Sequence, residues 1–181
     1  MKYLAILGSP RKEGNTAALL SSFLEGAASK GCSGNTLFLQ AKQIAPCTSC
    51  NGCKKDGTGV GQCVFADDMN GLYPLVEKAD VLIYAIPVYW WSIPAHTKAF
   101  MDRLYALDYS VFKGKKLCLL MTFQGEEPNS GPVLIEKTFR DICEWLGVDF
   151  SGCLAVCSGT TPVGENRDAL EKAFRLGASI L

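Results

Sequence analysis

The sequence predicts an α/β fold in three layers, with a five-stranded parallel sheet covered by helices on both faces. Short apolar runs alternate with longer amphipathic segments along the 181 residues, as strands and helices do in βαβ units. The apolar runs are continuous, which is typical of strands buried on both faces. Because 48% of the residues are hydrophobic, the chain has enough apolar surface for one sizeable core. We therefore expect a single domain over residues 1–181.

The elements can be assigned in chain order. The apolar run YLAIL at 3–7 is the first expected strand, and it ends in Gly-Ser-Pro. Residues 15–29 carry leucines and a phenylalanine at helical spacing, which predicts the first helix. Further strands are expected at 35–40, 80–88, 116–123 and 153–159, and further helices at 93–107, at 133–146 and from 165 onward.

One stretch, at about 41–69, is irregular and holds a cluster of cysteines. It is too long for an ordinary connection, which indicates a functional loop. In an open parallel sheet, ligands bind outside the carboxyl ends of the strands. The loops that follow the predicted strands near Gly8, Pro87, Thr122 and Ser158 are therefore the first places to look for a site.

Charge and hydropathy exclude several classes of partner. The formal net charge is zero and the charges of both signs are scattered, so we expect neither a nucleic-acid nor a membrane partner. The apolar run before Gly8 is too short for a signal peptide, and no run approaches transmembrane length. We expect a soluble cytoplasmic protein. Since cytosolic reductants keep thiols reduced, we do not expect the nine cysteines to form a disulfide framework.

The first loop, ILGSPRKEGNTAALL, has the composition of an anion site. Backbone amides at a helix N-terminus attract anions, aided by the helix dipole. Ser9, Asn15 and Thr16 add neutral donors, and Arg11 adds a positive charge. The alternative is a plain turn between strand and helix, capped by Asn or Thr.

Spacing excludes three familiar phosphate loops. Gly8 and Gly14 are separated by five residues instead of the four of a Walker loop, and no lysine follows the second glycine. The GxGxxG pattern of dinucleotide sites is missing, and no cysteine has an arginine six positions later, as a low-molecular-weight phosphatase requires. What remains is a cradle for a terminal phosphate carried on a larger ligand.

The loop after the third expected strand reads PVYWWSIP, at 87–94. Three consecutive aromatic residues between prolines form a stiff, flat surface that suits a planar heterocycle. The alternative is that these aromatic side chains cover the following helix or an oligomer interface. A phosphate cradle after the first strand combined with an aromatic surface after the third points to FMN.

The residues quoted so far extend to a wider resemblance. The segments GSPRKEGNT, PCTSCNGC…CVFADDM and ADVLIYAIPVYWWSIPAHTKAFMDR, with a closing helix after Gly164, resemble the flavodoxin-like NADPH-dependent FMN reductase family, which includes iron–sulfur flavoproteins. The resemblance covers almost the whole chain. It implies strand order 2-1-3-4-5, FMN at the carboxyl edge of the sheet and NAD(P)H as co-substrate. It also implies a homodimer or homotetramer with the flavin near the subunit interface.

The resemblance carries over to individual residues by position. The residues that would hold the FMN phosphate are Ser9, Arg11, Asn15 and Thr16. The residues that would line the isoalloxazine are Pro87, Val88, Tyr89, Trp90 and Trp91, with a third loop of Thr122, Phe123, Gln124 and Gly125.

The clustered cysteines leave three interpretations open. Cys47, Cys50 and Cys53 follow the pattern C-x2-C-x2-C, and Cys63 lies ten residues beyond Cys53. Such short spacing suits the thiolate ligands of an iron–sulfur cluster, as the resemblance to iron–sulfur flavoproteins also implies. The alternatives are reduced thiols in a structural loop, and zinc binding or thiol redox chemistry.

The remaining candidate residues favour structural roles. We expect His96, the single histidine, to face solvent or an interface. Asp67 and Asp68 precede a helical segment, which predicts capping. Asp102 and Arg103 are expected to form a helix-end salt bridge or a subunit contact. The sequence offers no Ser-His-Asp set and no HExxH motif for acid–base hydrolysis.

These predictions favour an FMN-dependent NAD(P)H oxidoreductase that reduces a quinone or another small acceptor. The rival hypothesis is an iron–sulfur flavoprotein electron carrier that accepts electrons from a ferredoxin-like protein. A third interpretation is a binding module that kept the fold and lost FMN.

Overall fold

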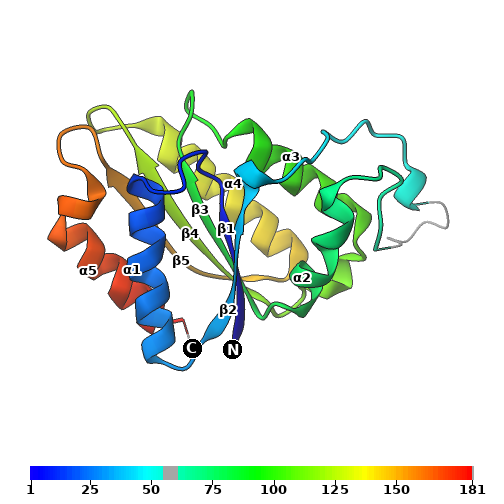
Figure 1. Cartoon of the computed structure of the whole chain (residues 1–181), viewed down its shortest axis with the longest axis horizontal. Coiled ribbons are helices and arrows are strands. Elements are labelled where there is room, and N and C mark those ends of the chain that lie inside the picture. Colours follow the sequence, from blue (N-terminus) through cyan, green and yellow to red (C-terminus); the bar gives the residue numbers. More distant parts are fainter. Residues whose placement is uncertain (55–60, 181) are drawn as a thin grey trace.

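Five parallel strands form the central sheet, in the spatial order β2-β1-β3-β4-β5 (Figure 1). The computed structural model describes residues 1–54 and 61–180. The strands are β1 (Lys2–Leu7), β2 (Ser33–Phe38), β3 (Val81–Pro87), β4 (Lys116–Phe123) and β5 (Asp149–Cys157). The predicted parallel sheet and its implied strand order are both confirmed.

Helices cover both faces of this sheet, as the three-layer prediction requires (Figure 1). On one face lie α1 (Asn15–Ser29) and α5 (Arg167–Ala178). On the other lie α2 (Tyr73–Lys78), α3 (Ala95–Arg103) and α4 (Ser130–Leu146). Among the described residues, no helix is long and apolar enough to cross a membrane.

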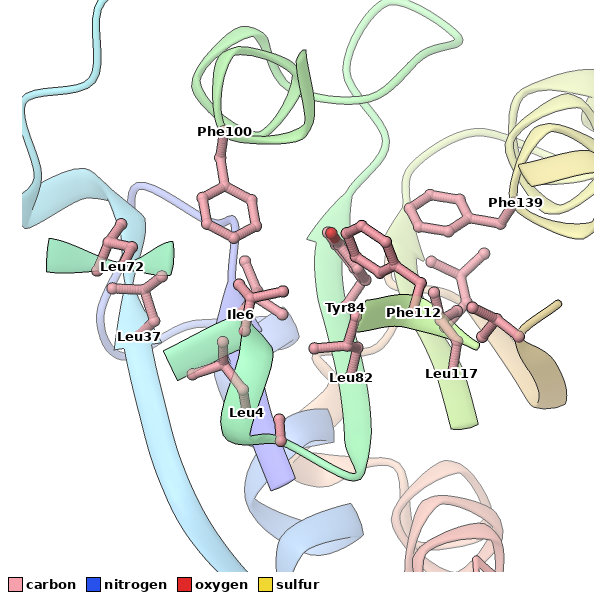
Figure 2. Close-up of a cluster of buried hydrophobic side chains, with 14 of the residues drawn as sticks. Leu4, Ile6, Leu37, Leu72, Leu82, Tyr84, Phe100, Phe112, Leu117 and Phe139 are labelled. Carbon is pink, nitrogen blue, oxygen red and sulfur yellow. The ribbon is translucent and has the colours of Figure 1, made fainter. Parts of the chain in front are cut away.

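A separate hydrophobic core lies on each face of the sheet. All seven residues of β3 are buried, which explains why its sequence is apolar without interruption. In the core beneath α3 and α4, Phe100 points from α3 toward Ile6 of β1 (Figure 2). In the same core, Tyr84 of β3 packs edge-on against Phe139 of α4, with ring centroids 4.9 Å apart. On the opposite face, α1 and α5 meet through glycine: a Cβ on Gly177 would lie 1.9 Å from the Phe23 carbonyl oxygen.

Several predicted boundaries need correction. The strand expected at 35–40 runs from Ser33 to Phe38, because Leu39–Ala41 turns into a 3-10 helix. The strand expected at 153–159 is Asp149–Cys157, since this half-buried edge strand begins with polar residues that no apolar run marks. The helix expected at 93–107 is α3 followed by a 3-10 turn at Leu104–Ala106. The helix expected at 133–146 starts earlier, at Ser130, because the Asn129 side chain caps it.

Candidate functional site

Four of the loops at the carboxyl edge of the sheet meet around one cavity of about 220 Å³. These loops lie along the same edge in Figure 1, at the top of the view. The lining residues come from the loops after β1, β3, β4 and β5, and they are Ser9, Arg11, Gly14, Asn15, Thr16, Pro87, Val88, Tyr89, Thr122, Phe123, Gln124 and Ser158. All four predicted phosphate residues and six of the nine predicted ring residues therefore line one space.

The first loop is held rigidly against the sheet and α3. The Gly8 amide donates to the Ala85 carbonyl oxygen over 2.8 Å. A Cβ on Gly8 would lie 2.3 Å from Thr97 Oγ1, so no larger residue fits here without movement. No side chain caps α1 at Gly14, whereas Asn129 caps α4 and Asn166 caps α5. The start of α1 thus has no side-chain cap for its first amides, and Gly14, Asn15 and Thr16 line the cavity.

Two side chains of the first loop also join it to distant segments. Asn15 Oδ1 accepts a hydrogen bond of 2.9 Å from the amide of Val163, which lies 148 residues away in the chain. Thr16 Oγ1 and Thr122 Oγ1 are 2.7 Å apart and share a buried hydrogen bond. Asn15 Oδ1 therefore has a structural partner, whereas the side-chain nitrogen Nδ2 is a donor on a residue that lines the cavity. Sequence reasoning missed both contacts, because no local pattern marks them.

The aromatic residues after β3 form a tight turn with an unusual backbone. Tyr89 and Ser92 exchange two backbone hydrogen bonds, of 3.0 and 2.9 Å. The two residues between them, Trp90 and Trp91, have φ angles of 49° and 60°. Turns of this kind normally place Asn-Gly at these positions. Bulky side chains in left-handed backbone are strained, and such strain is concentrated at functional sites.

A second cavity, of about 790 Å³, lies beside this turn. Gln124 lines both cavities, and Gly125 and Trp91 line the second. The predicted ring residues are thus divided between the two spaces. Trp90 lines neither, and its side chain is 90% exposed. The remaining wall, which sequence reasoning did not predict, consists of Glu126, Pro128, Asn129, Ser130 and Val133.

His96, which was expected at solvent or at an interface, is not fully exposed to solvent in the single chain. Its ring is half-buried beneath the first loop and interacts with the backbone of Gly8. Burial lowers the pKa of His96, and the hydrogen bond with Gly8 acts in the opposite direction without cancelling the effect. A neutral imidazole that supports the loop from below is consistent with a structural role.

The four clustered cysteines line a cavity of about 440 Å³ together with Phe65, Asp102 and Tyr105. Cys47 and Cys50 are exposed, while Cys53 and Cys63 are half-buried against the core. Burial raises the pKa of Cys53. Four thiols suit iron–sulfur or zinc ligation in their chemistry. Over residues 1–54 and 61–180, however, no group of three or more His, Cys, Asp or Glu side chains is arranged to hold a metal ion.

The acidic residues near this loop have separate roles. Asp67 caps the 3-10 helix at Asp68–Gly71 by accepting from the Met69 amide, which confirms the predicted capping. Asp102 forms an exposed salt bridge with Lys98 on α3. Arg103, its neighbour in sequence, is buried and pairs with Asp67 instead. Asp102 and Arg103 therefore do not act as a pair.

Comparison with known proteins places this geometry among flavin enzymes. The family model for NADPH-dependent FMN reductases matches residues 1–148. An iron–sulfur flavoprotein of Methanosarcina thermophila is 34% identical over 148 residues, which cover 82% of this chain and 74% of that protein. An iron–sulfur flavoprotein of Archaeoglobus fulgidus is 32% identical over 181 residues, covering 99% and 79%. The NAD(P)H:quinone oxidoreductase structure from Methanothermobacter marburgensis shares the fold, with a TM-score of 0.73 at 18% identity, covering 100% of this chain and 99% of that one.

Proposed function

The chain belongs to the NADPH-dependent FMN reductase family, and from this premise we propose that it passes electrons from NAD(P)H, by way of FMN, to a quinone or another small acceptor. The observation that carries this proposal is the single cavity that the loops after β1, β3, β4 and β5 share at the carboxyl edge of the sheet. When bound there, FMN would supply the hydride and electron chemistry, and the chain would supply binding and orientation.

The phosphate end of FMN fits the cradle at the start of α1. The amides of the first helical turn and the dipole of α1 attract an anion. The Ser9 side chain is 5% exposed, and its oxygen accepts from the Arg11 amide over 3.2 Å, which leaves its hydroxyl hydrogen to donate. Asn15 and Thr16 would add side-chain donors, and Arg11 would add the positive charge.

The isoalloxazine end would lie between the loop after β3, at 87–94, and the third loop. Pro87, Val88 and Tyr89 line the first cavity beside the predicted cradle, and Trp91 lines the second. The third loop, Thr122–Gly125, runs between the two spaces. Among the described lining residues there is no histidine or cysteine, so the chain's own contribution is a rigid, mostly uncharged surface.

Anaerobic reduction of the purified holoprotein tests this function. We expect NADPH or NADH to remove the oxidised-flavin absorbance rapidly, and a quinone to restore it. Reduction only by reduced ferredoxin would overturn the reductase in favour of an electron carrier. Protein that is colourless and does not take up added FMN would contradict both.

An iron–sulfur electron carrier is the second candidate, and one observation favours it. Cys47, Cys50, Cys53 and Cys63 line one cavity, and the relatives at 34% and 32% identity are named iron–sulfur flavoproteins. On this proposal the four thiolates would hold an iron–sulfur cluster and accept electrons from a ferredoxin-like protein. The side chains of the loop would have to move closer together to form such a ligand set.

We also propose that the chain forms a homodimer or homotetramer in the cytoplasm. An apolar cavity of about 530 Å³ lies between α3 and α4, and Trp145 and Tyr105 on its wall are 70% and 45% exposed. Exposed apolar surface of this kind is typical of protein interfaces. A second copy of this chain is the occupant that the family resemblance favours.

Trp145→Glu is expected to lower the oligomer mass in light scattering, because a buried interface does not accommodate an unpaired carboxylate. Leu134→Glu is the matched control, since Leu134 is also exposed on α4 but does not line this cavity. An unchanged mass for Trp145→Glu would place the interface elsewhere.

A further inference from the structure

Arg103, at the end of α3, is the starting point because its side chain is only 1% exposed. A buried guanidinium is stable only when it is paired. Arg103 Nη1 lies 2.7 Å from Asp67 Oδ2, and Nη2 lies 2.9 Å from Asp67 Oδ1, so the ion pair is bidentate. Arg103 Nη1 also donates to the Ala45 carbonyl oxygen over 2.9 Å.

These two partners come from opposite ends of the cysteine loop. Ala45 precedes Cys47 by two residues, and Asp67 follows Cys63 by four. Asp67 Oδ2 in turn accepts from the Ala45 amide over 2.9 Å, so the two ends are also joined directly. We name Arg103, Asp67 and Ala45 the Arg103 clamp. It closes the loop at its base and attaches it to α3.

Neighbouring contacts reinforce the closed base. Asp68 Oδ2 accepts from the Gln43 amide over 2.9 Å, and the Asp68 amide donates to the Gln43 carbonyl oxygen over 3.2 Å. Asn70 Oδ1 accepts from the Cys63 amide over 3.3 Å, and Asn70 Nδ2 donates to the Phe65 carbonyl oxygen over 2.8 Å. Each contact fixes the backbone next to a cysteine or next to the clamp.

The electrostatics keep both members of the clamp charged. Burial acts to lower the pKa of Arg103, but the hydrogen bonds with Asp67 outweigh it and the pKa is raised. Burial acts to raise the pKa of Asp67, but the bonds from Arg103 and the backbone amides lower it overall.

Helix α3 links the clamp to the predicted flavin surface. It begins directly after the aromatic turn, at Ala95, and ends at Arg103. Its nine residues span roughly 13 Å as a rigid rod. A displacement of the loop base relative to the turn would therefore require α3 to move or the clamp to open.

We propose that Arg103 is a positioning residue that holds the four cysteines in one place relative to the aromatic turn. Without the clamp the loop would open at its base, and Cys53 and Cys63 would lose their protected positions. The inference that this positioning serves a metal centre rests on the proposed function. The inference that Arg103 positions the loop rests only on the contacts described above.

Timed alkylation of the full-length FMN-loaded protein, treated with a chelator and located by mass spectrometry, tests the clamp. In the native protein we expect Cys47 and Cys50 to react rapidly and Cys53 and Cys63 slowly, as their exposure indicates. In Arg103→Met, opening of the loop should raise the rates at Cys53 and Cys63 by about tenfold or more. The buried Cys32 and Cys118 should stay protected, which reports that the fold is intact.

Conservative variants separate positioning from a general loss of packing. Arg103→Lys should restore part of the protection, because an ammonium can still pair with Asp67. Asp67→Asn should resemble Arg103→Met, and the double variant should be no worse than either single one, since all remove the same ion pair. Arg140→Gln, which removes an exposed pair with Glu136 on α4, should change nothing.

Unchanged rates at Cys53 and Cys63 in Arg103→Met would overturn the proposal. If that variant does not fold, unchanged rates at Cys53 and Cys63 in Asp67→Asn would overturn the proposal equally. Anaerobic reconstitution with ferrous iron and sulfide gives an independent readout, the visible absorption of the cluster. A native protein that takes up no iron would contradict the electron carrier, while the alkylation rates would still decide the role of Arg103.

Discussion

Asn15→Asp is expected to weaken FMN binding by about 30- to 100-fold, measured by titrating the flavin-free protein with FMN. Two like charges about 4 Å apart repel by roughly 1 kcal/mol in water and 4 kcal/mol near a protein surface, and 1.4 kcal/mol corresponds to a tenfold change in affinity. Because Asn15 is half-buried at the cavity wall, we expect a repulsion energy between these two values, which gives the stated loss of affinity.

The structure makes this substitution a selective test. An aspartate at position 15 can still accept the hydrogen bond from the Val163 amide, which Asn15 Oδ1 now accepts. A negative charge at the start of α1 is also favourable for the helix. The thermal stability of the flavin-free protein should therefore be unchanged or slightly higher, so that a loss of affinity reports on the phosphate alone.

Two further variants serve as controls for the cradle. Asn166→Asp makes the same change at the start of α5, where the side chain caps the helix away from the cavity, and FMN affinity should be unaffected. Asn15→Ala removes the Val163 contact without adding charge and should cost less affinity than Asn15→Asp. If Asn15→Asp binds FMN like the native protein, the loop is only a helix start and the phosphate lies elsewhere.

If the four clustered thiolates hold the proposed iron–sulfur cluster, Cys50→Ser is expected to abolish bound iron and acid-labile sulfide in anaerobically purified protein. A serine hydroxyl is a poor replacement for thiolate in an iron–sulfur cluster. Cys50 is exposed between Ser49 and Asn51, whose φ angles of 55° and 56° turn the backbone on both sides of it. Its replacement should therefore cost little stability, and the flavin absorbance should be retained.

Cys157→Ser is the matched control for metal content. Cys157, the last residue of β5, is half-buried, and its thiol donates to the Gly125 carbonyl oxygen of the third loop over 3.1 Å. Cys157 does not line the cysteine cavity. The iron content of the Cys157→Ser variant should equal that of the native protein. Native protein without iron or sulfide would support reduced thiols in a structural loop, and unchanged iron in Cys50→Ser would exclude Cys50 as a ligand.

The sequence was most informative where structure depends on neighbouring residues. The uninterrupted apolar run of β3 and the helical spacing of α1 are local patterns, and α1 has the predicted bounds Asn15–Ser29. Prediction was weaker at β5, where an edge strand starts with polar residues. Of its first four residues, Asp149, Phe150 and Gly152 pair with β4 through the backbone, and such pairing leaves no mark on hydropathy.

By itself, then, the sequence determined the class of fold, the parallel sheet and the loops that meet at its carboxyl edge. Strand and helix periodicity follow from the local pattern of residues, and the direction of the parallel strands follows from the order of the elements along the chain. Only the tertiary structure decided which side chains meet. The bonds of Thr16 with Thr122 and of Arg103 with Asp67 join residues 106 and 36 positions apart. Such pairs form when packed elements bring buried polar groups together, and burial then requires each group to find a partner.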